Sequence, residues 1–129
     1  MTSPTPTQQH IDYWLKRQRE QQASDQSLAD EARMLLNQIV SLLVNEYGAR
    51  RIILFGSLAR RRFAADSDID LAVEGLDRGR YFEALAAASR LAQRWVDLKP
   101  LEDLDEHFKQ RVLATGECIY AQQELESKE

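Results

Sequence analysis

Residues 55–73 read FGSLARRRFAADSDIDLAV, and this stretch decides the fold. Gly56 and Ser57 follow Phe55, and ten further residues lead to the triplet Asp68-Ile69-Asp70. Residues two apart on a β-strand point to the same face, so both carboxylates can reach one pair of hard cations. A Gly-Ser turn offers backbone N–H groups to a phosphate. The stretch therefore predicts a site for a triphosphate with Mg²⁺.

The residues around the Gly-Ser turn predict a phosphate cradle. The apolar run over residues 51–55 is typical of a buried strand, and Ser57 is placed to cap a short helix over residues 58–62. Five arginines flank the turn and predict a positive patch that attracts a triphosphate. For each of them a solvated surface charge is the alternative; they are Arg50, Arg51, Arg60, Arg61 and Arg62.

Two later segments predict strands that lie beside the first. Apolar residues alternate with Asp68 and Asp70 up to residue 73, which is the period of a strand with one buried face. Residues 95–99 alternate in the same way, and Asp97 takes the position of the aspartate pair. Residues 81–92 predict a helix between these strands, with an apolar face that returns the chain to the sheet.

The N-terminal third predicts helices. Thr7 is placed to cap a helix that begins at Gln8 and carries an apolar patch formed by Ile11, Trp14 and Leu15. Residues 16–27 are too polar to join a core by themselves, so this segment is either a frayed helix or an arm that meets a partner. Ser27 is expected to begin a separate core helix, which Gly48 ends.

The composition predicts one soluble domain. The chain has 129 residues, 43% of them hydrophobic and 29% charged, and its net charge of −4 argues against extended nucleic-acid binding. It shows no secretory signal and no apolar run that could cross a membrane, so we expect a cytoplasmic protein. The single cysteine, Cys118, excludes an internal disulfide and is expected in the core. Trp14 and Trp95 are expected to be packing residues, and His10 and His107 are too few for a zinc site.

The C-terminal part predicts two more elements, and the charged candidates have simpler alternatives. Residues 101–115 predict a helix and residues 118–121 an edge strand. Asp68 and Asp70 could instead cap the turn after Ser67, but two carboxylates on one strand face repel each other unless cations or donors compensate. Lys99 is expected to be a solvated charge at the end of its strand.

Residues 35–121 resemble the minimal nucleotidyltransferases of the DNA polymerase β superfamily, through LFGSLARRRFAADSDIDLAV and WVDLKPLEDL. The resemblance implies an α/β (α+β) fold in which helices flank a small mixed sheet, with an extra N-terminal helical arm. It divides the chain into residues 1–26, a nucleotidyltransferase domain over 27–121 and a polar tail over 122–129. Arg61 departs from the family pattern because a glycine usually stands there.

The same resemblance implies the site and its chemistry. Gly56 and Ser57 would hold the triphosphate, whereas Asp68, Asp70 and Asp97 would bind two divalent cations, Mg²⁺ or Mn²⁺. Arg60 and Lys99 are weaker candidates for phosphate contacts. The implied reaction is a two-metal nucleotidyl transfer with ATP as the substrate.

Small proteins of this kind resemble the antitoxins of HEPN/MNT toxin–antitoxin pairs. The resemblance implies that the chain forms a hetero-oligomer with a HEPN ribonuclease toxin and silences it by transferring AMP to one of its tyrosines. Two alternatives stay open. The chain could be a non-catalytic antitoxin that neutralises its partner by covering it, or an adenylyltransferase for a small molecule such as an aminoglycoside.

Overall fold

The computed structural model describes residues 7–60, 62–64 and 67–122. Its centre is a four-stranded sheet with the strand order β3-β2-β1-β4. β2 and β3 are parallel, whereas β1 is antiparallel to both β2 and β4. The main elements in chain order are α1 (Gln8–Tyr47), β1 (Arg51–Phe55), α2 (Gly56–Ala59), β2 (Ile69–Glu74), α3 (Tyr81–Ala92), β3 (Val96–Pro100), α4 (Glu106–Thr115) and β4 (Glu117–Ala121). The predicted mixed sheet and its four strands are confirmed.

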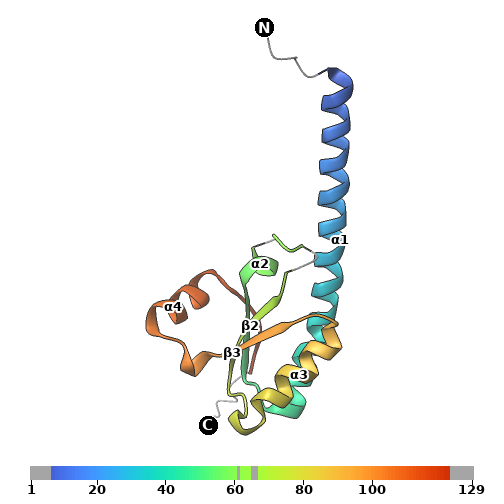
Figure 1. Cartoon of the computed structure of the whole chain (residues 1–129). Helices are drawn as coiled ribbons and strands as arrows, with labels where there is room; N and C mark the ends of the chain where they lie inside the picture. The colour runs from blue at the N-terminus through green and yellow to red at the C-terminus, as the bar shows by residue number, and fades with distance from the viewer. Residues whose placement is uncertain (1–6, 61, 65–66, 123–129) are drawn as a thin grey trace.

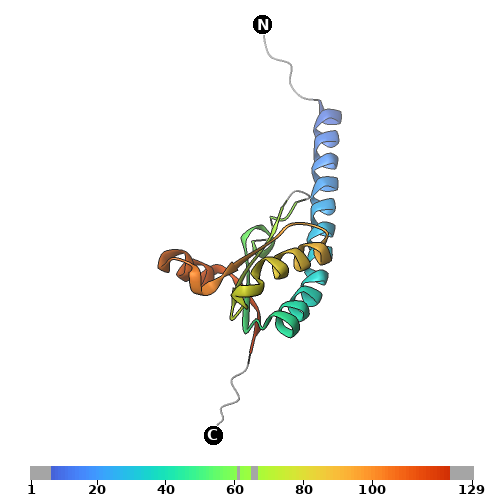
Figure 2. The ribbon, with the colours of Figure 1, turned by 60° about the horizontal axis from the view of Figure 1, so that its bottom comes forward.

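Helices cover both faces of the sheet (Figures 1 and 2). α1 and α3 lie on one face, where Ile39 and Leu43 of α1 and Ala88 of α3 belong to the larger core. α4 lies on the other face, over a smaller core that contains Ile53 and Val112. Burial on both faces explains why residues 52–55 form an uninterrupted apolar run rather than an alternating one.

α1 is one continuous helix, so the prediction of a separate helix starting at Ser27 was wrong. The stretch from residue 8 to residue 47 contains neither glycine nor proline, and a polar segment therefore continues the helix without a break. Both predicted ends are confirmed. The Thr7 side chain accepts a hydrogen bond from the His10 N–H at 3.2 Å, and Gly48 adopts a left-handed conformation with φ 78° directly after the helix.

Two short helical segments differ from the prediction at their starts. α2 begins at Gly56, with Phe55 as the capping residue, so Ser57 lies inside the helix and does not cap it. The predicted helix over residues 101–115 begins only at Glu106, because the Asp105 side chain accepts the Phe108 N–H at 2.9 Å and caps it there. The preceding residues form the 3₁₀ turn η2 (Leu101–Asp103). A second 3₁₀ turn, η1 (Arg78–Arg80), precedes α3.

Cys118, which was expected in the core, and two tryptophans that were expected to be packing residues are exposed. Cys118 lies on the edge strand β4 and is exposed; no residue of this strand is fully buried. Trp14 is 66% exposed, since it lies on the part of α1 that extends beyond the sheet, and Trp95, just before β3, is 52% exposed. Within the described residues, no helix has the length and apolar character that crossing a membrane requires.

Candidate active site

Three adjacent strands bring the predicted site residues to one end of the sheet. β1 ends at Phe55 and continues directly into Gly56, whereas Asp70 and Asp97 are each the second residue of their strands. In the strand register Phe55 lies opposite Asp70, and Asp70 lies opposite Asp97. The predicted aspartate pair and the later aspartate are therefore neighbours, although Asp97 follows Asp70 by 27 positions in the sequence.

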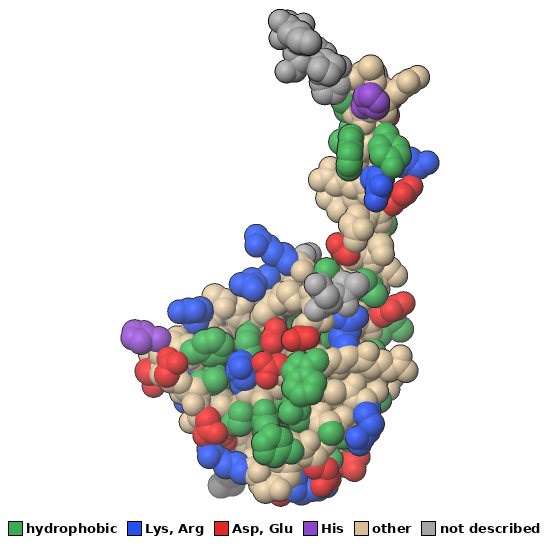
Figure 3. All heavy atoms as spheres, viewed as in Figure 1, with side chains coloured by type: hydrophobic (Ala, Val, Ile, Leu, Met, Phe, Trp, Pro, Cys, Tyr) green, Lys and Arg blue, Asp and Glu red, His purple; other side chains and the backbone are tan. Residues whose placement is uncertain are grey.

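Strand alternation turns the aspartates away from the larger core. Ile69 and Leu71 are fully buried against α1 and α3, so Asp70 between them points to the face that α4 covers. Asp97 lies in the same way between the buried Val96 and Leu98. Figure 3 shows acidic side chains gathered over β2 and β3, with a basic side chain beside them.

Asp70 carries a negative charge that is poorly compensated. Partial burial raises the pKa of the Asp70 carboxyl, and the nearby carboxylates of Asp97 and Asp68 raise it further. The positive charges of Lys99 and Arg60 act in the opposite direction and do not cancel this effect. Within the described part of the chain, no hydrogen bond or ion pair joins Asp68 or Asp70 to another side chain.

The turn after Ala64 has its own cap, which removes one alternative for the aspartates. The Ser67 Oγ accepts the Ala64 N–H at 3.0 Å, and the Ser67 N–H donates to the Ala64 carbonyl at 3.0 Å. The carboxylates of Asp68 and Asp70 take no part in these bonds. Turn capping therefore does not account for the aspartate pair.

Gly56 is the position where the cradle tolerates no side chain. Its φ of +77° lies in the left-handed region, and a Cβ built on it would stand 2.2 Å from Asp70 Oδ2. The backbone of the Gly-Ser segment thus runs directly against the central carboxylate. Ser57 follows inside α2 and is half-buried.

A cleft of about 310 Å³ opens between α2, the start of β2 and α4. Arg60 and Asp70 line it from one side, and Arg111 lines it from α4. Phe108 packs edge-to-face on Phe55 with ring centroids 5.8 Å apart, which holds α4 over this end of the sheet. Arg111 was not among the predicted site residues; its position one helical turn after the inward-facing Phe108 is the signal that could have identified it.

The predicted positive patch is smaller than expected. Arg51 lies roughly 15 Å from Gly56, because the five-residue strand β1 separates them. There it pairs with Glu74 at 3.3 Å. Arg50 precedes it on the same side, and Arg61 lies outside the described residues. Of the five arginines, Arg60 lines the cleft.

Lys99 and Tyr81 fix the surroundings of Asp97. The Lys99 ammonium lies 3.2 Å from Asp97 Oδ2, so this lysine points along the site face and is only partly exposed. The Tyr81 hydroxyl donates to the Leu98 carbonyl at 2.6 Å and thereby joins the start of α3 to β3. Burial and the charge of Asp97 raise the pKa of the Tyr81 hydroxyl, which keeps it protonated as a donor.

The donor set fits a divalent cation in its chemistry and charge. Three carboxylates, two of them on neighbouring strands, offer the hard oxygen ligands that Mg²⁺ and Mn²⁺ prefer, and the pKa of Asp70 is raised by partial burial and by the other two carboxylates. Across the described residues, no three potential ligands already converge as a preformed metal site. Asp97 instead pairs with Lys99, so a cation would have to displace that ammonium.

Comparison with known proteins agrees with this geometry. The profile of the family described as "Polymerase beta, Nucleotidyltransferase" matches residues 37–125. The "Putative protein adenylyltransferase" of Methanocaldococcus jannaschii is 33% identical over 78 residues, which span 60% of this chain and 60% of that protein.

Solved structures of toxin–antitoxin complexes contain chains with the same fold. One is a toxin–antitoxin with AMP-PNP, with a TM-score of 0.61, 28% identity and coverage of 67% of this chain and 73% of the other. Another is a tri-AMPylated Shewanella oneidensis HEPN toxin in complex with an MNT antitoxin, with a TM-score of 0.57, 26% identity and coverage of 71% and 74%. The family profile spans most of the chain, and the chain therefore belongs to the polymerase β nucleotidyltransferase family.

Proposed function

We propose that this chain transfers AMP from ATP to a hydroxyl group of a partner protein, a tyrosine of a HEPN ribonuclease toxin, and acts as its antitoxin in the cytoplasm. The observation that carries the proposal is the pairing of Asp70 with Asp97 beside Gly56, with a surplus of negative charge, in a chain of this family. The AMP-PNP and AMPylated-toxin complexes with similar chains support the choice of nucleotide and partner.

In this proposal Asp68, Asp70 and Asp97 hold divalent cations. When bound, such cations neutralise the triphosphate and polarise the acceptor hydroxyl. Asp97 has to leave Lys99 to take up this role, and the freed ammonium then lies on the site face, where it can contact a phosphate. Gly56 and Ser57 would hold the phosphates through their backbone, and Arg60 would add positive charge from the cleft wall.

The proposed step forms one bond and breaks one. The acceptor oxygen bonds to the α-phosphorus of ATP, and the bond from that phosphorus to the bridging oxygen breaks, so pyrophosphate leaves. The hydroxyl proton passes to Asp97, which is partly exposed and can return it to water. No oxidant or reductant is required.

A non-catalytic antitoxin is the second candidate, and one contact favours it. The Asp97–Lys99 ion pair already neutralises one of the three aspartates without any metal. Under this reading, the nucleotide site would be a remnant and the partner would be silenced by being covered.

ATP labelled at either the α- or the γ-phosphate tests the proposed reaction. We expect the α-label to appear on the purified HEPN-domain protein of the same genome, and the γ-label to leave with pyrophosphate. Label transfer from the γ-position would instead mean phosphorylation. Silencing of the toxin with neither label attached would favour the non-catalytic antitoxin, and label on a panel aminoglycoside but not on protein would favour the small-molecule enzyme.

A further inference from the structure

α1 extends far beyond the sheet, at the end that carries the candidate active site (Figures 1 and 2). Arg33 ties α1 to the rest of the molecule near the base of this extension, because its guanidinium donates to the Leu58 carbonyl of α2 at 3.4 Å and pairs with Glu117 at 3.1 Å; Leu28 and Ala29, one turn earlier, still pack against the larger core. Ile11 lies 22 residues before Arg33, which is about 33 Å along a helix. We call residues 8–26 the arm.

The arm carries large apolar side chains in contact with water. Ile11 is 41% exposed, Trp14 is 66% exposed and Leu15 is 48% exposed. Every residue from Thr7 to Ser24 is exposed, so this part of the helix gains no stability from packing against the sheet. An unsupported helix of this length is marginal in water, and a cluster of exposed apolar residues marks an interaction site.

The apolar cluster points to the same side as the inward face of α1. Eighteen residues make five full turns of an α-helix, so residues 18 apart point in the same direction. Eighteen residues after Ile11, Trp14 and Leu15 come Ala29, Ala32 and Arg33, respectively. These three face the sheet and α2: Ala32 is 3% exposed, and the other two line a groove. The arm thus overhangs the active-site end of the molecule with its apolar face turned inward.

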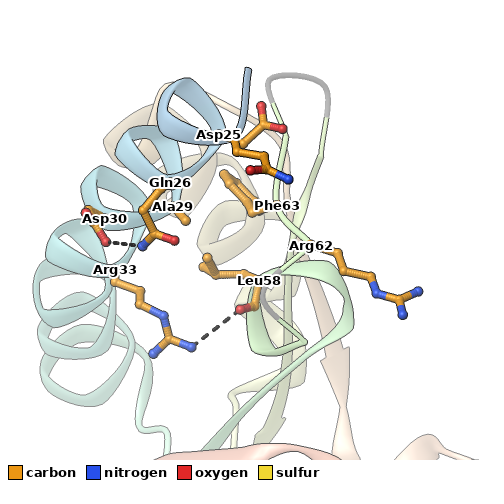
Figure 4. Close-up of a pocket in the computed structure, with 9 residues that line it drawn as sticks. Asp25, Gln26, Ala29, Asp30, Arg33, Leu58, Arg62 and Phe63 are labelled. Atoms are coloured by element: carbon orange, nitrogen blue, oxygen red, sulfur yellow. Dashed lines mark hydrogen bonds between the residues drawn. The ribbon is translucent and has the colours of Figure 1, made fainter. Parts of the chain in front are cut away.

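The groove at the base of the arm is about 560 Å³ in volume and lies between α1 and α2 (Figure 4). Its floor is apolar and consists of Ala29, Leu58 and Phe63. Asp25 and Asp30 stand on its α1 wall, where their hydrogen bonds come from the neutral amides of Gln21 at 3.0 Å and Gln26 at 2.8 Å.

The charge balance of the groove is acidic. Against the carboxylates of Asp25, Asp30 and Glu117 stand two guanidinium groups: Arg33 is paired with Glu117, and Arg62 lines the groove with its side chain directed away from α1 in Figure 4. The carboxylates of Asp25 and Asp30 are therefore available to a cationic group that enters from outside. An apolar floor with carboxylates above it fits a protein ridge that carries lysine or arginine, and it repels a nucleic-acid backbone.

We propose that the arm and this groove form the docking surface for the acceptor protein, through a helix or ridge that bears apolar side chains flanked by Lys or Arg. The inference rests on the proposed function. α2 links the two sites, since Leu58 lines the groove while Ala59 and Arg60 line the active-site cleft. The family profile begins at residue 37, so the arm lies outside the matched part of the chain.

Titration of the full chain with the HEPN-domain protein of the same genome tests the docking surface. Trp14→Ala combined with Leu15→Ala should weaken binding about 10- to 100-fold, because truncation of large buried anchors has effects of this order. Asp25→Lys combined with Asp30→Lys should weaken it as well, through repulsion of the cationic ridge. Met34→Ala is the matched control, since Met34 is a 74% exposed residue of the same helix that does not line the groove. It should bind as the unaltered chain does.

AMP transfer measured on the same samples separates this inference from the proposed function. Equal affinity of the Trp14/Leu15 variant and the unaltered chain would overturn the docking surface, even where AMP transfer persists. Arm-dependent binding without any AMP transfer would reject the proposed reaction alone and leave the docking surface in place. Light scattering of the chain by itself tests whether a second copy of the chain binds this surface instead. If the chain forms a dimer that the arm substitutions dissociate, and if its affinity for the HEPN protein is unchanged, the surface belongs to the dimer and the inference is overturned.

Discussion

Gly56→Ala should damage the active site more than it damages the fold. At φ +77° an L-residue costs about 1–2 kcal/mol relative to glycine. The added Cβ would also stand 2.2 Å from Asp70 Oδ2, so the carboxylate must retreat by roughly 1 Å to reach ordinary contact. A displacement of this size at a reacting centre costs on the order of 100-fold in rate.

We therefore expect Gly56→Ala to lower the melting temperature by roughly 4–8 °C and to lower the rate of AMP transfer by about 100-fold. Scanning calorimetry and label transfer from α-labelled ATP measure the two effects. Gly79→Ala is the control, because Gly79 has no positive φ and a Cβ there would meet its nearest neighbour, Asp77, at an ordinary 3.4 Å. A Gly56→Ala protein with the stability and rate of the unaltered chain would refute the close approach of this backbone to Asp70.

Three further predictions follow from single contacts. The pKa of Asp70 is raised in the folded state, so the ionised carboxylate destabilises the fold. Asp70→Asn should therefore melt at a higher temperature than the unaltered chain at pH 7. That difference in melting temperature should shrink as the pH falls through the raised pKa, because the Asp70 carboxyl then becomes protonated. A constant difference from pH 7 to pH 3 would contradict this. Tyr81→Phe removes the donor to the Leu98 carbonyl and should lower the free energy of unfolding in urea by about 1 kcal/mol, whereas no change would show that the bond contributes nothing. Lys99→Met removes the ammonium that competes for Asp97 and should lower the Mg²⁺ concentration for half-maximal activity about two- to fivefold; an increase would mean that Lys99 assists the metal.

The strands and the aspartates could be predicted because their signals are local. Alternation around Asp70 and Asp97 fixes which face each carboxylate takes, and the structure places them opposite each other. The packing of α4 against the sheet did not follow from these patterns, and it brings Arg111 close to Gly56. Such proximities arise from tertiary packing, which no short-range period records.

The exposure of individual side chains was the property that the sequence predicted least well. Hydrophobic type alone predicted a buried Cys118, yet an edge strand leaves it exposed. The polar residues 16–27 concealed the continuity of α1, because a helix without a packed face shows no apolar period. The same continuity shows that the apolar cluster around Trp14 lies on the inward face of the helix, which the sequence pattern alone did not reveal.

The intact mass of the HEPN-domain protein, after incubation with this chain, ATP and Mg²⁺, tests the central claim most directly. The control is the chain with Asp68→Asn and Asp70→Asn, which keeps the size of both side chains and removes their charge. We predict a mass increase of one or more AMP units with the unaltered chain and none with the control. A partner that stays unmodified with the unaltered chain, or that gains AMP equally with the control, would contradict the account.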